Sequence, residues 1–130
     1  MRRDMELIRA LLLKFEEMPL EASTVYSIDF GDAMFAIEGY NFDEIVYHLG
    51  LILEAGFTEP QNNQGMTSFT YSGLTWRGHD FLDSVRDPKI WLDTKAVLKT
   101  AGGFTLDLMM GAAKALVKQK LRELGLDIDV

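Results

Sequence analysis

The amino-acid sequence predicts one α+β domain, and three observations lead to this fold class. The chain has 130 residues, the usual size of a single domain. Apolar residues recur at helical spacing in several capped segments, whereas strand-forming residues gather between the early helices. The chain has no cysteine, so a packed apolar core, and no disulfide, must hold the fold together. Within the domain we expect a core over residues 1–86 and a helical extension over residues 87–130.

The first helix is expected from about Asp4 to Met18. Asp4 is suited to the N-cap position, because its carboxylate can accept hydrogen bonds from the first free N–H groups of the helix. Pro19 ends the helix, because the residue before a proline is displaced from the α region. The apolar stripe of this helix comprises Met5, Leu7, Ile8, Leu11, Leu12, Phe15 and Met18.

Two β-hairpins are expected on either side of the second helix. Strand-forming residues occupy positions 24–28 and 34–37, with the turn-rich tetrad Asp29–Asp32 between them. Residues 57–59 and 66–71 have the same character and flank a polar loop at residues 60–65. The first pair predicts a hairpin before the second helix, and the second pair predicts a hairpin with a polar tip after it.

The second helix is expected from Asn41 to Ala55. Asn41 and Glu44 have the spacing of a capping box, in which each side chain accepts a hydrogen bond from the backbone N–H of the other residue. Gly56 ends the helix, because glycine adopts the left-handed conformation of a C-terminal stop without steric cost. The apolar positions of the helix are Phe42, Ile45, Val46, Leu49, Ile52 and Leu53.

Three more helices are expected in the second half of the chain. Thr75 caps a short helix, Asp87 and the following proline begin another, and the last runs from about Thr105 to Leu124. We expect Trp76 and Trp91 to be core residues. The apolar residues of the last helix are spaced 4, 3, 4, 4 and 3 residues apart, and they are Leu106, Met110, Ala113, Val117, Leu121 and Leu124. This near-heptad seam predicts either packing within the domain or association with a protein partner or a second copy.

Four blocks of the sequence resemble a known family. They are residues 1–9, 37–40, 47–57 and 74–83, and the last of these is the most specific. The blocks are similar to a family of small bacterial and phage proteins, domain of unknown function family 2513. Residues 47–57 also look like the recognition-helix end of winged-helix regulators. The resemblance implies a winged-helix-like core with additional C-terminal helices in a bacterial or prophage protein, although residues 20–40 have β character where such regulators have a middle helix.

Charge disfavours DNA as a ligand of the second helix. The chain carries 13 Lys+Arg against 20 Asp+Glu, a net charge of −7. Residues 41–60 include four acidic residues and no lysine or arginine, whereas affinity for DNA depends mainly on neutralising phosphates. The outward face of this helix and the neutral hairpin tip form a candidate interaction surface, which comprises Asp43, Tyr47, Leu51, Glu54, Gln61, Asn62 and Asn63.

No combination of residues points to catalysis or to a metal site. His79 and Asp80 resemble part of a metal-dependent hydrolase site, but the chain has two histidines and zinc sites usually need more histidine ligands or cysteine. His79 and Asp83 are four residues apart, so we expect them to pair on a helix surface. We expect His48 to be exposed or to bond the hairpin. The sequence therefore predicts no enzymatic activity, no catalytic residue, no metal and no cofactor.

These observations predict a cytoplasmic, non-enzymatic regulatory or adaptor module that acts through protein contacts. No segment approaches the roughly 18 uncharged apolar residues of a membrane span, so no membrane contact is expected. Besides the second helix, the last helix offers Leu106, Met110, Val117 and Leu121 to a partner or a second copy. One alternative is a winged-helix DNA-binding regulator that holds phosphates with its basic C-terminal helices. A third hypothesis is an acidic decoy that occupies the groove of a DNA-binding protein.

Overall fold

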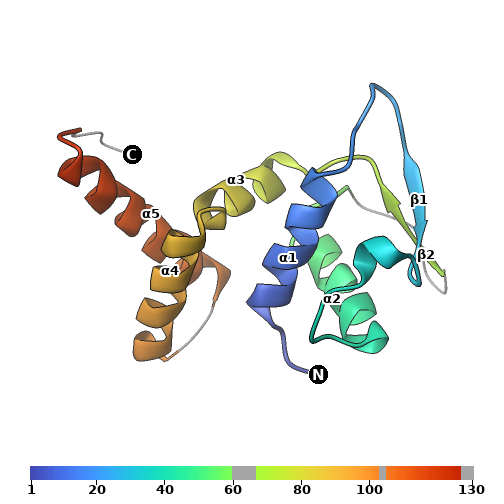
Figure 1. Cartoon of the computed structure of the whole chain (residues 1–130), viewed down its shortest axis with the longest axis horizontal. Coiled ribbons are helices and arrows are strands. Elements are labelled where there is room, and N and C mark those ends of the chain that lie inside the picture. Colours follow the sequence, from blue (N-terminus) through green and yellow to red (C-terminus); the bar gives the residue numbers. More distant parts are fainter. Residues whose placement is uncertain (60–66, 103–104, 127–130) are drawn as a thin grey trace. The chain divides into compact units, whose positions relative to one another are not determined.

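The computed structural model of the chain describes residues 1–59, 67–102 and 105–126 (Figure 1). These residues form five α-helices, one short 3₁₀ helix and a two-stranded antiparallel sheet, so the predicted α+β class is confirmed. The chain divides into two compact units, of which one ends at Asp80 and the other begins at Phe81. This boundary falls inside helix α3 (Trp76–Val85). The division after residue 86 that the sequence suggests stays a prediction.

Helix α1 (Met5–Glu16) begins where the sequence predicts it. The Asp4 carboxylate accepts hydrogen bonds from the backbone N–H groups of Glu6 at 2.9 Å and Leu7 at 3.4 Å, so it caps the helix. Each buried apolar side chain stabilises the fold by about 1.5–3 kcal/mol. The buried residues of α1 are Met5, Leu7, Ile8, Leu11, Leu12 and Phe15.

The hairpin predicted for residues 24–37 is wrong. Strand β1 (Tyr26–Asp29) instead pairs antiparallel with β2 (Ser68–Tyr71), which lies far along the chain (Figure 1). The second predicted strand is the 3₁₀ helix η1 (Ala33–Phe35). The reason is local: the Asp32 carboxylate accepts a hydrogen bond from the Met34 N–H at 2.8 Å, which caps a helical turn.

The second predicted hairpin is correct in one strand and wrong in its main pairing. Residues 68–71 are a strand, as predicted, but their partner is β1. Of the residues expected to form the other strand, Thr58 makes an isolated bridge with Leu74. The predicted tip, residues 60–65, lies outside the described residues.

An aromatic cluster fixes β2 against α1, and the pairing with β1 adds apolar side chains to the same core. The Phe15 ring of α1 stacks on Tyr71 with ring centres 4.4 Å apart and on Phe69 at 5.2 Å. Phe35 of η1 meets the Phe15 ring edge-on at 5.8 Å. Pairing β1 with β2 aligns Ile28 with Phe69, and both side chains are buried. The register thus places the apolar side of both strands in the core.

Helix α2 (Phe42–Glu54) matches the predicted second helix. Both halves of the capping box form: the Glu44 N–H donates to Asn41 at 2.9 Å, and the Asn41 N–H donates to Glu44 at 3.1 Å. Helix α2 packs against α1. Its buried residues are Ile45, His48, Leu49 and Ile52.

The second unit contains the helical pair α4 (Pro88–Ala101) and α5 (Leu106–Glu123), which pack against each other (Figure 1). Both helices agree with the predicted segments. Gly102 ends α4 in the left-handed conformation, with a φ of 84°. The Thr105 hydroxyl caps α5 by accepting a hydrogen bond from the Leu108 N–H at 3.2 Å.

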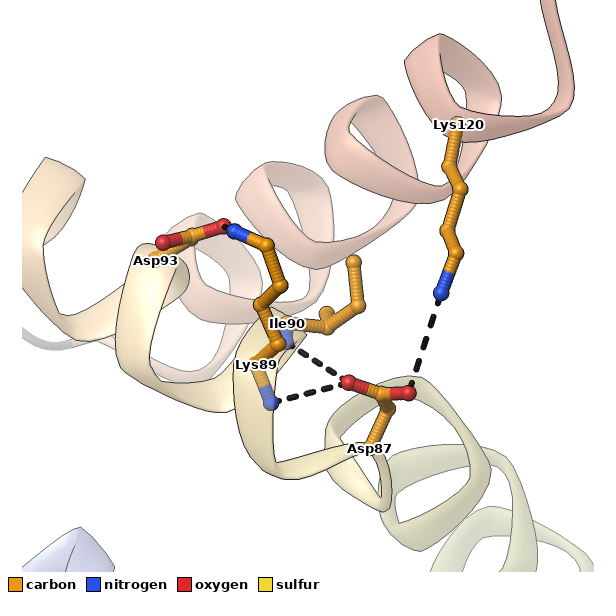
Figure 2. Close-up of polar contacts among 5 residues, drawn as sticks. All are labelled: Asp87, Lys89, Ile90, Asp93 and Lys120. Atoms are coloured by element: carbon orange, nitrogen blue, oxygen red, sulfur yellow. Dashed lines mark hydrogen bonds and ion pairs between the residues drawn. The ribbon is translucent and has the colours of Figure 1, made fainter. Parts of the chain in front are cut away.

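Asp87 links the start of α4 to α5 (Figure 2). One carboxylate oxygen accepts the N–H groups of Lys89 at 2.8 Å and Ile90 at 3.0 Å, and the other lies 3.8 Å from the Lys120 ammonium of α5. The hydrogen bond from Ile90, with further help from Lys89 and Lys120, lowers the pKa of Asp87 below its ordinary value. Asp87 therefore serves as a charged N-cap and as a tie between the two helices.

Candidate functional site

The exposed side of α2 is the part of the predicted interaction surface that the structure assembles. Asp43, Tyr47, Gly50 and Glu54 are exposed and follow one another at helical spacing. The Tyr47 side chain is 44% exposed, and Phe42, in the first turn of the same helix, is 55% exposed. Leu51 is half-buried at the edge of this side. We define the α2 face as Phe42, Asp43, Tyr47, Gly50 and Glu54.

The α2 face lies in a long stretch of the chain without positive side chains. Between Lys14 and Arg77 the sequence contains no lysine or arginine. The ten acidic residues of this stretch are Glu16, Glu17, Glu21, Asp29, Asp32, Glu38, Asp43, Glu44, Glu54 and Glu59. The Arg77 guanidinium bonds the Ala55 carbonyl oxygen at 2.9 Å, at the end of the helix. The α2 face therefore combines negative charge with exposed aromatic rings.

A groove borders the first two turns of α2. It has a volume of about 500 Å³, and its lining is mainly apolar. The residues that line it come from the end of β1 and the turn after it, from α2 and from the residue before β2: Asp29, Phe30, Gly31, Phe42, Val46 and Thr67. Sequence reasoning missed this groove. The available signal was Phe42, an aromatic residue at the first position of a helix with Val46 one turn later.

His48 does not belong to the exposed surface, contrary to expectation, and it does not bond the hairpin. Its side chain is 1% exposed. Its Nδ1 lies 2.7 Å from the Glu44 carbonyl oxygen, and its Nε2 accepts the Asp4 backbone N–H at 2.8 Å. Since a carbonyl can only accept and an N–H can only donate, Nδ1 carries the ring proton. His48 thus joins the middle of α2 to the start of α1.

Tyr40 completes this polar junction. Its hydroxyl donates to the second Asp4 carboxylate oxygen at 2.7 Å. Burial, together with the hydrogen bond to Asp4 and the negative charge of that carboxylate, raises the pKa of Tyr40 to about 12. Asp4 therefore caps α1, binds Tyr40 and binds His48 at the same time. We interpret these contacts as structural, because the Asp4 carboxylate, the Tyr40 hydroxyl and the His48 ring each already have a partner within the protein.

The most specific sequence block, residues 74–83, fixes the end of α2. The Thr75 hydroxyl donates to the Gly56 carbonyl oxygen and accepts the Gly78 N–H at 3.0 Å. The Thr75 N–H donates to the Phe57 carbonyl oxygen at 2.9 Å. Gly78 lies so close to Phe57 that a Cβ on Gly78 would be 2.3 Å from that oxygen. Backbone packing therefore explains Thr75 and Gly78 of this block.

Two expectations for α3 are wrong. Trp76 is 84% exposed, whereas Trp91 is buried as predicted. The reason is helical geometry: Phe81 and Val85 are buried on the side of α3 opposite to Trp76. His79 does not pair with Asp83, because the Asp83 carboxylate binds Arg86 at 2.6 Å.

His79 and Asp80 are both exposed. Within residues 1–59, 67–102 and 105–126, no cluster of three or more histidine, aspartate or glutamate side chains has a geometry that could hold a metal ion. In the same residues, no helix has the length and apolar character needed to cross a membrane. Gln61, Asn62 and Asn63, the predicted hairpin-tip part of the surface, lie outside the described residues.

The predicted seam of α5 is divided between the interior and the surface. Ala113 is fully buried, Val117 and Leu124 are exposed, and Leu106, Met110 and Leu121 are half-buried. A different side of α5 faces the solvent. There Lys114 and Arg122 are exposed, and Lys118 between them is half-buried; the three are spaced four residues apart, so they lie along one line of the helix surface. We call these three residues the basic stripe.

Comparison with known proteins identifies the family that the sequence blocks suggest. The model of the family described as "Hypothetical protein (DUF2513)" matches residues 2–104, and the chain belongs to this family. An "Uncharacterized protein" of Haemophilus influenzae is 27% identical over 124 residues, which cover 93% of this chain and 99% of that protein. No solved structure matches the chain.

Proposed function

We propose that this protein is a non-enzymatic regulatory or adaptor module that binds a protein partner through the α2 face. The main support is that α2 exposes two aromatic side chains, Phe42 and Tyr47, within a stretch of the chain that has no lysine or arginine. Exposed aromatic side chains are typical anchors of protein interfaces. Acidic neighbours such as Asp43 and Glu54 select a partner with a basic surface. The proposal places the module in the cytoplasm of a bacterium or its prophage, in keeping with the bacterial relative.

A winged-helix-like core is part of the proposal. The order α1, β1, η1, α2 and β2, the pairing of β1 with β2, and the bridge between Thr58 and Leu74 support this assignment. Helix α2 then has the position of a recognition helix. The short η1 stands where a middle helix is normal, which supports a degenerate helix-turn-helix.

DNA binding through the C-terminal helices is the second candidate function. A helix face that carries Asp43 and Glu54 repels phosphates, so the α2 face itself is a poor site for DNA. The described residues from 89 to 126 carry seven basic and three acidic side chains. This basic region favours a regulator that holds DNA with α4 and α5. An acidic decoy that binds a DNA-binding protein is the third candidate, since it uses the same negative face.

A site-specific crosslink tests the proposal. A photoreactive benzoylphenylalanine at Tyr47 is expected to crosslink a protein in nuclease-treated bacterial lysate, because this side chain is exposed at the centre of the α2 face. The matched control carries the same group at Val25, which is exposed in the loop before β1. Equal crosslinking from both positions, or none from Tyr47, would contradict the proposal.

A mobility shift with pooled host DNA separates the second candidate from the first. Tight binding that weakens steeply with salt would favour the DNA-binding regulator. A charge reversal in α5, Lys114→Glu, should then weaken the DNA complex, whereas Asp43→Lys should not.

A further inference from the structure

The exposed side of α5 carries positive charge, whereas the α2 face carries negative charge. The two ends of the basic stripe, Lys114 and Arg122, are eight residues apart, or about 12 Å of helix at 1.5 Å per residue. Apolar side chains flank it: Val117 on one side, and on the other Leu108, which is 51% exposed. A positive helix side with apolar flanks is suited to an acidic surface that contains aromatic rings.

The α2 face and its groove offer such a surface. Asp43 and Glu54 are eleven residues apart, or about 16 Å along the helix, so they bracket a length similar to that of the basic stripe. Tyr47 lies between them, and Phe42 opens onto the apolar groove of about 500 Å³. The carboxylate of Asp29 adds negative charge at the groove. The two helix surfaces thus carry charges of opposite sign over similar lengths, so they can pack side by side.

We propose that the α2 face binds α5 of a second copy of this chain. This inference rests on the proposed function, because it uses the same face and names its occupant. Each copy supplies one α2 face and one basic stripe, so two copies can exchange them in two identical contacts, as two-fold dimers commonly do. The contact joins charged groups at a solvent-accessible rim, and salt therefore weakens it.

Sedimentation of the purified full-length chain and of two charge-reversal variants tests the inference. At low salt and about 100 µM protein, a concentration that saturates contacts of micromolar affinity, we expect a dimer. Asp43→Lys and Lys114→Glu should each raise the dimer dissociation constant about tenfold or more, because each reversal occurs twice per dimer. The controls Glu21→Lys and Lys99→Glu change the same charges at exposed positions outside the contact and should leave the dimer intact.

Mixing the two variants gives the decisive result. In the mixture, the reversed α2 face of one variant meets the reversed stripe of the other, and the two unchanged elements meet each other. We therefore expect the mixture to form dimers although neither variant does so alone. A dimer that Lys114→Glu abolishes and Asp43→Lys leaves unchanged would instead indicate contact between two α5 helices and overturn the inference. A monomer at low salt, whether or not the α2 face binds α5 of the same chain, would also overturn it.

Failure of this inference can be distinguished from failure of the proposed function. If the purified chain is monomeric but position 47 still crosslinks a different protein in lysate, the occupant is a foreign partner and the adaptor proposal stands. If position 47 crosslinks only another copy of the chain, and the crosslinked residue lies in α5, the second-copy inference is supported.

Discussion

Replacing Gly78 with alanine tests the explanation of the most specific sequence block. A Cβ at Gly78 would lie 2.3 Å from the Phe57 carbonyl oxygen and 3.0 Å from the carbonyl carbon, whereas ordinary contacts are 3.4–4 Å. The Phe57 peptide is held in place, because its carbonyl oxygen accepts the Thr75 N–H at 2.9 Å and its N–H donates to Ile52 at 3.1 Å. The added methyl group can therefore be accommodated only if backbone hydrogen bonds are displaced.

The magnitude follows from two opposing effects. Alanine is favoured over glycine in a helix by about 0.8–1 kcal/mol. Overpacking costs about 1–3 kcal/mol and occasionally more, and an overlap of this size with backbone lies at the upper end. Gly78→Ala should therefore lower the free energy of unfolding by about 2 kcal/mol. Gly50→Ala in α2 should raise it by about 0.8–1 kcal/mol, because a Cβ at Gly50 meets nothing within 4 Å.

Urea unfolding followed by far-UV circular dichroism measures this difference. The midpoint should fall for Gly78→Ala and rise for Gly50→Ala relative to the unchanged chain. Gly111→Ala in α5 is a second control, since a Cβ there also meets nothing within 4 Å. If Gly78→Ala unfolds at the same midpoint as the unchanged chain, or above it, the close approach to Phe57 is not what requires glycine at this position.

Three further predictions concern titratable side chains. His48→Phe should destabilise the chain by about 1–3 kcal/mol in the same urea assay, because it leaves the Asp4 N–H without its acceptor; nitrogen NMR of the unchanged chain should show the ring proton on Nδ1, and a proton on Nε2 would contradict this geometry. Burial raises the pKa of Tyr40 and of Tyr71 from 10.0 to about 12. The contribution of the two protonated hydroxyls to stability is therefore complete below pH 10 and lost as the pH rises toward 12. Thermal unfolding at increasing pH should show this loss, and Tyr40→Phe should reduce it. Because the pKa of Asp87 is lowered, its effect on stability has the opposite pH dependence. The stabilisation by the Asp87 carboxylate is present above about pH 4 and lost as the pH falls through the lowered pKa. Asp87→Asn, which retains a capping side chain, should therefore reduce the loss of stability at acid pH.

The sequence by itself determined the five α-helices and most of their ends. Asp4, Asn41 and Asp87 all cap the helices that they were expected to cap, and the last helix begins after Thr105, where it was expected to begin. A cap is a hydrogen bond to an N–H group two or three residues away, so the information lies within one short segment of the chain. The charge of α2 also follows from one short segment, because its acidic residues can be counted directly along the chain. The exposure of Asp43, Tyr47, Gly50 and Glu54 also followed from the apolar spacing of α2, whereas Phe42, counted among its apolar positions, is exposed.

Only the tertiary structure decided which distant segments meet. Strand β2 pairs with the distant β1 and stacks Phe69 and Tyr71 on Phe15 of α1, and His48 accepts a hydrogen bond from a backbone N–H 44 residues away. The groove beside α2 is made from three separate segments. Local spacing shows which side of an element is apolar, but a strand edge or a ring nitrogen can be satisfied by many partners. Packing density in the core and the need to satisfy buried polar groups select one of them, and these conditions apply to the whole folded chain.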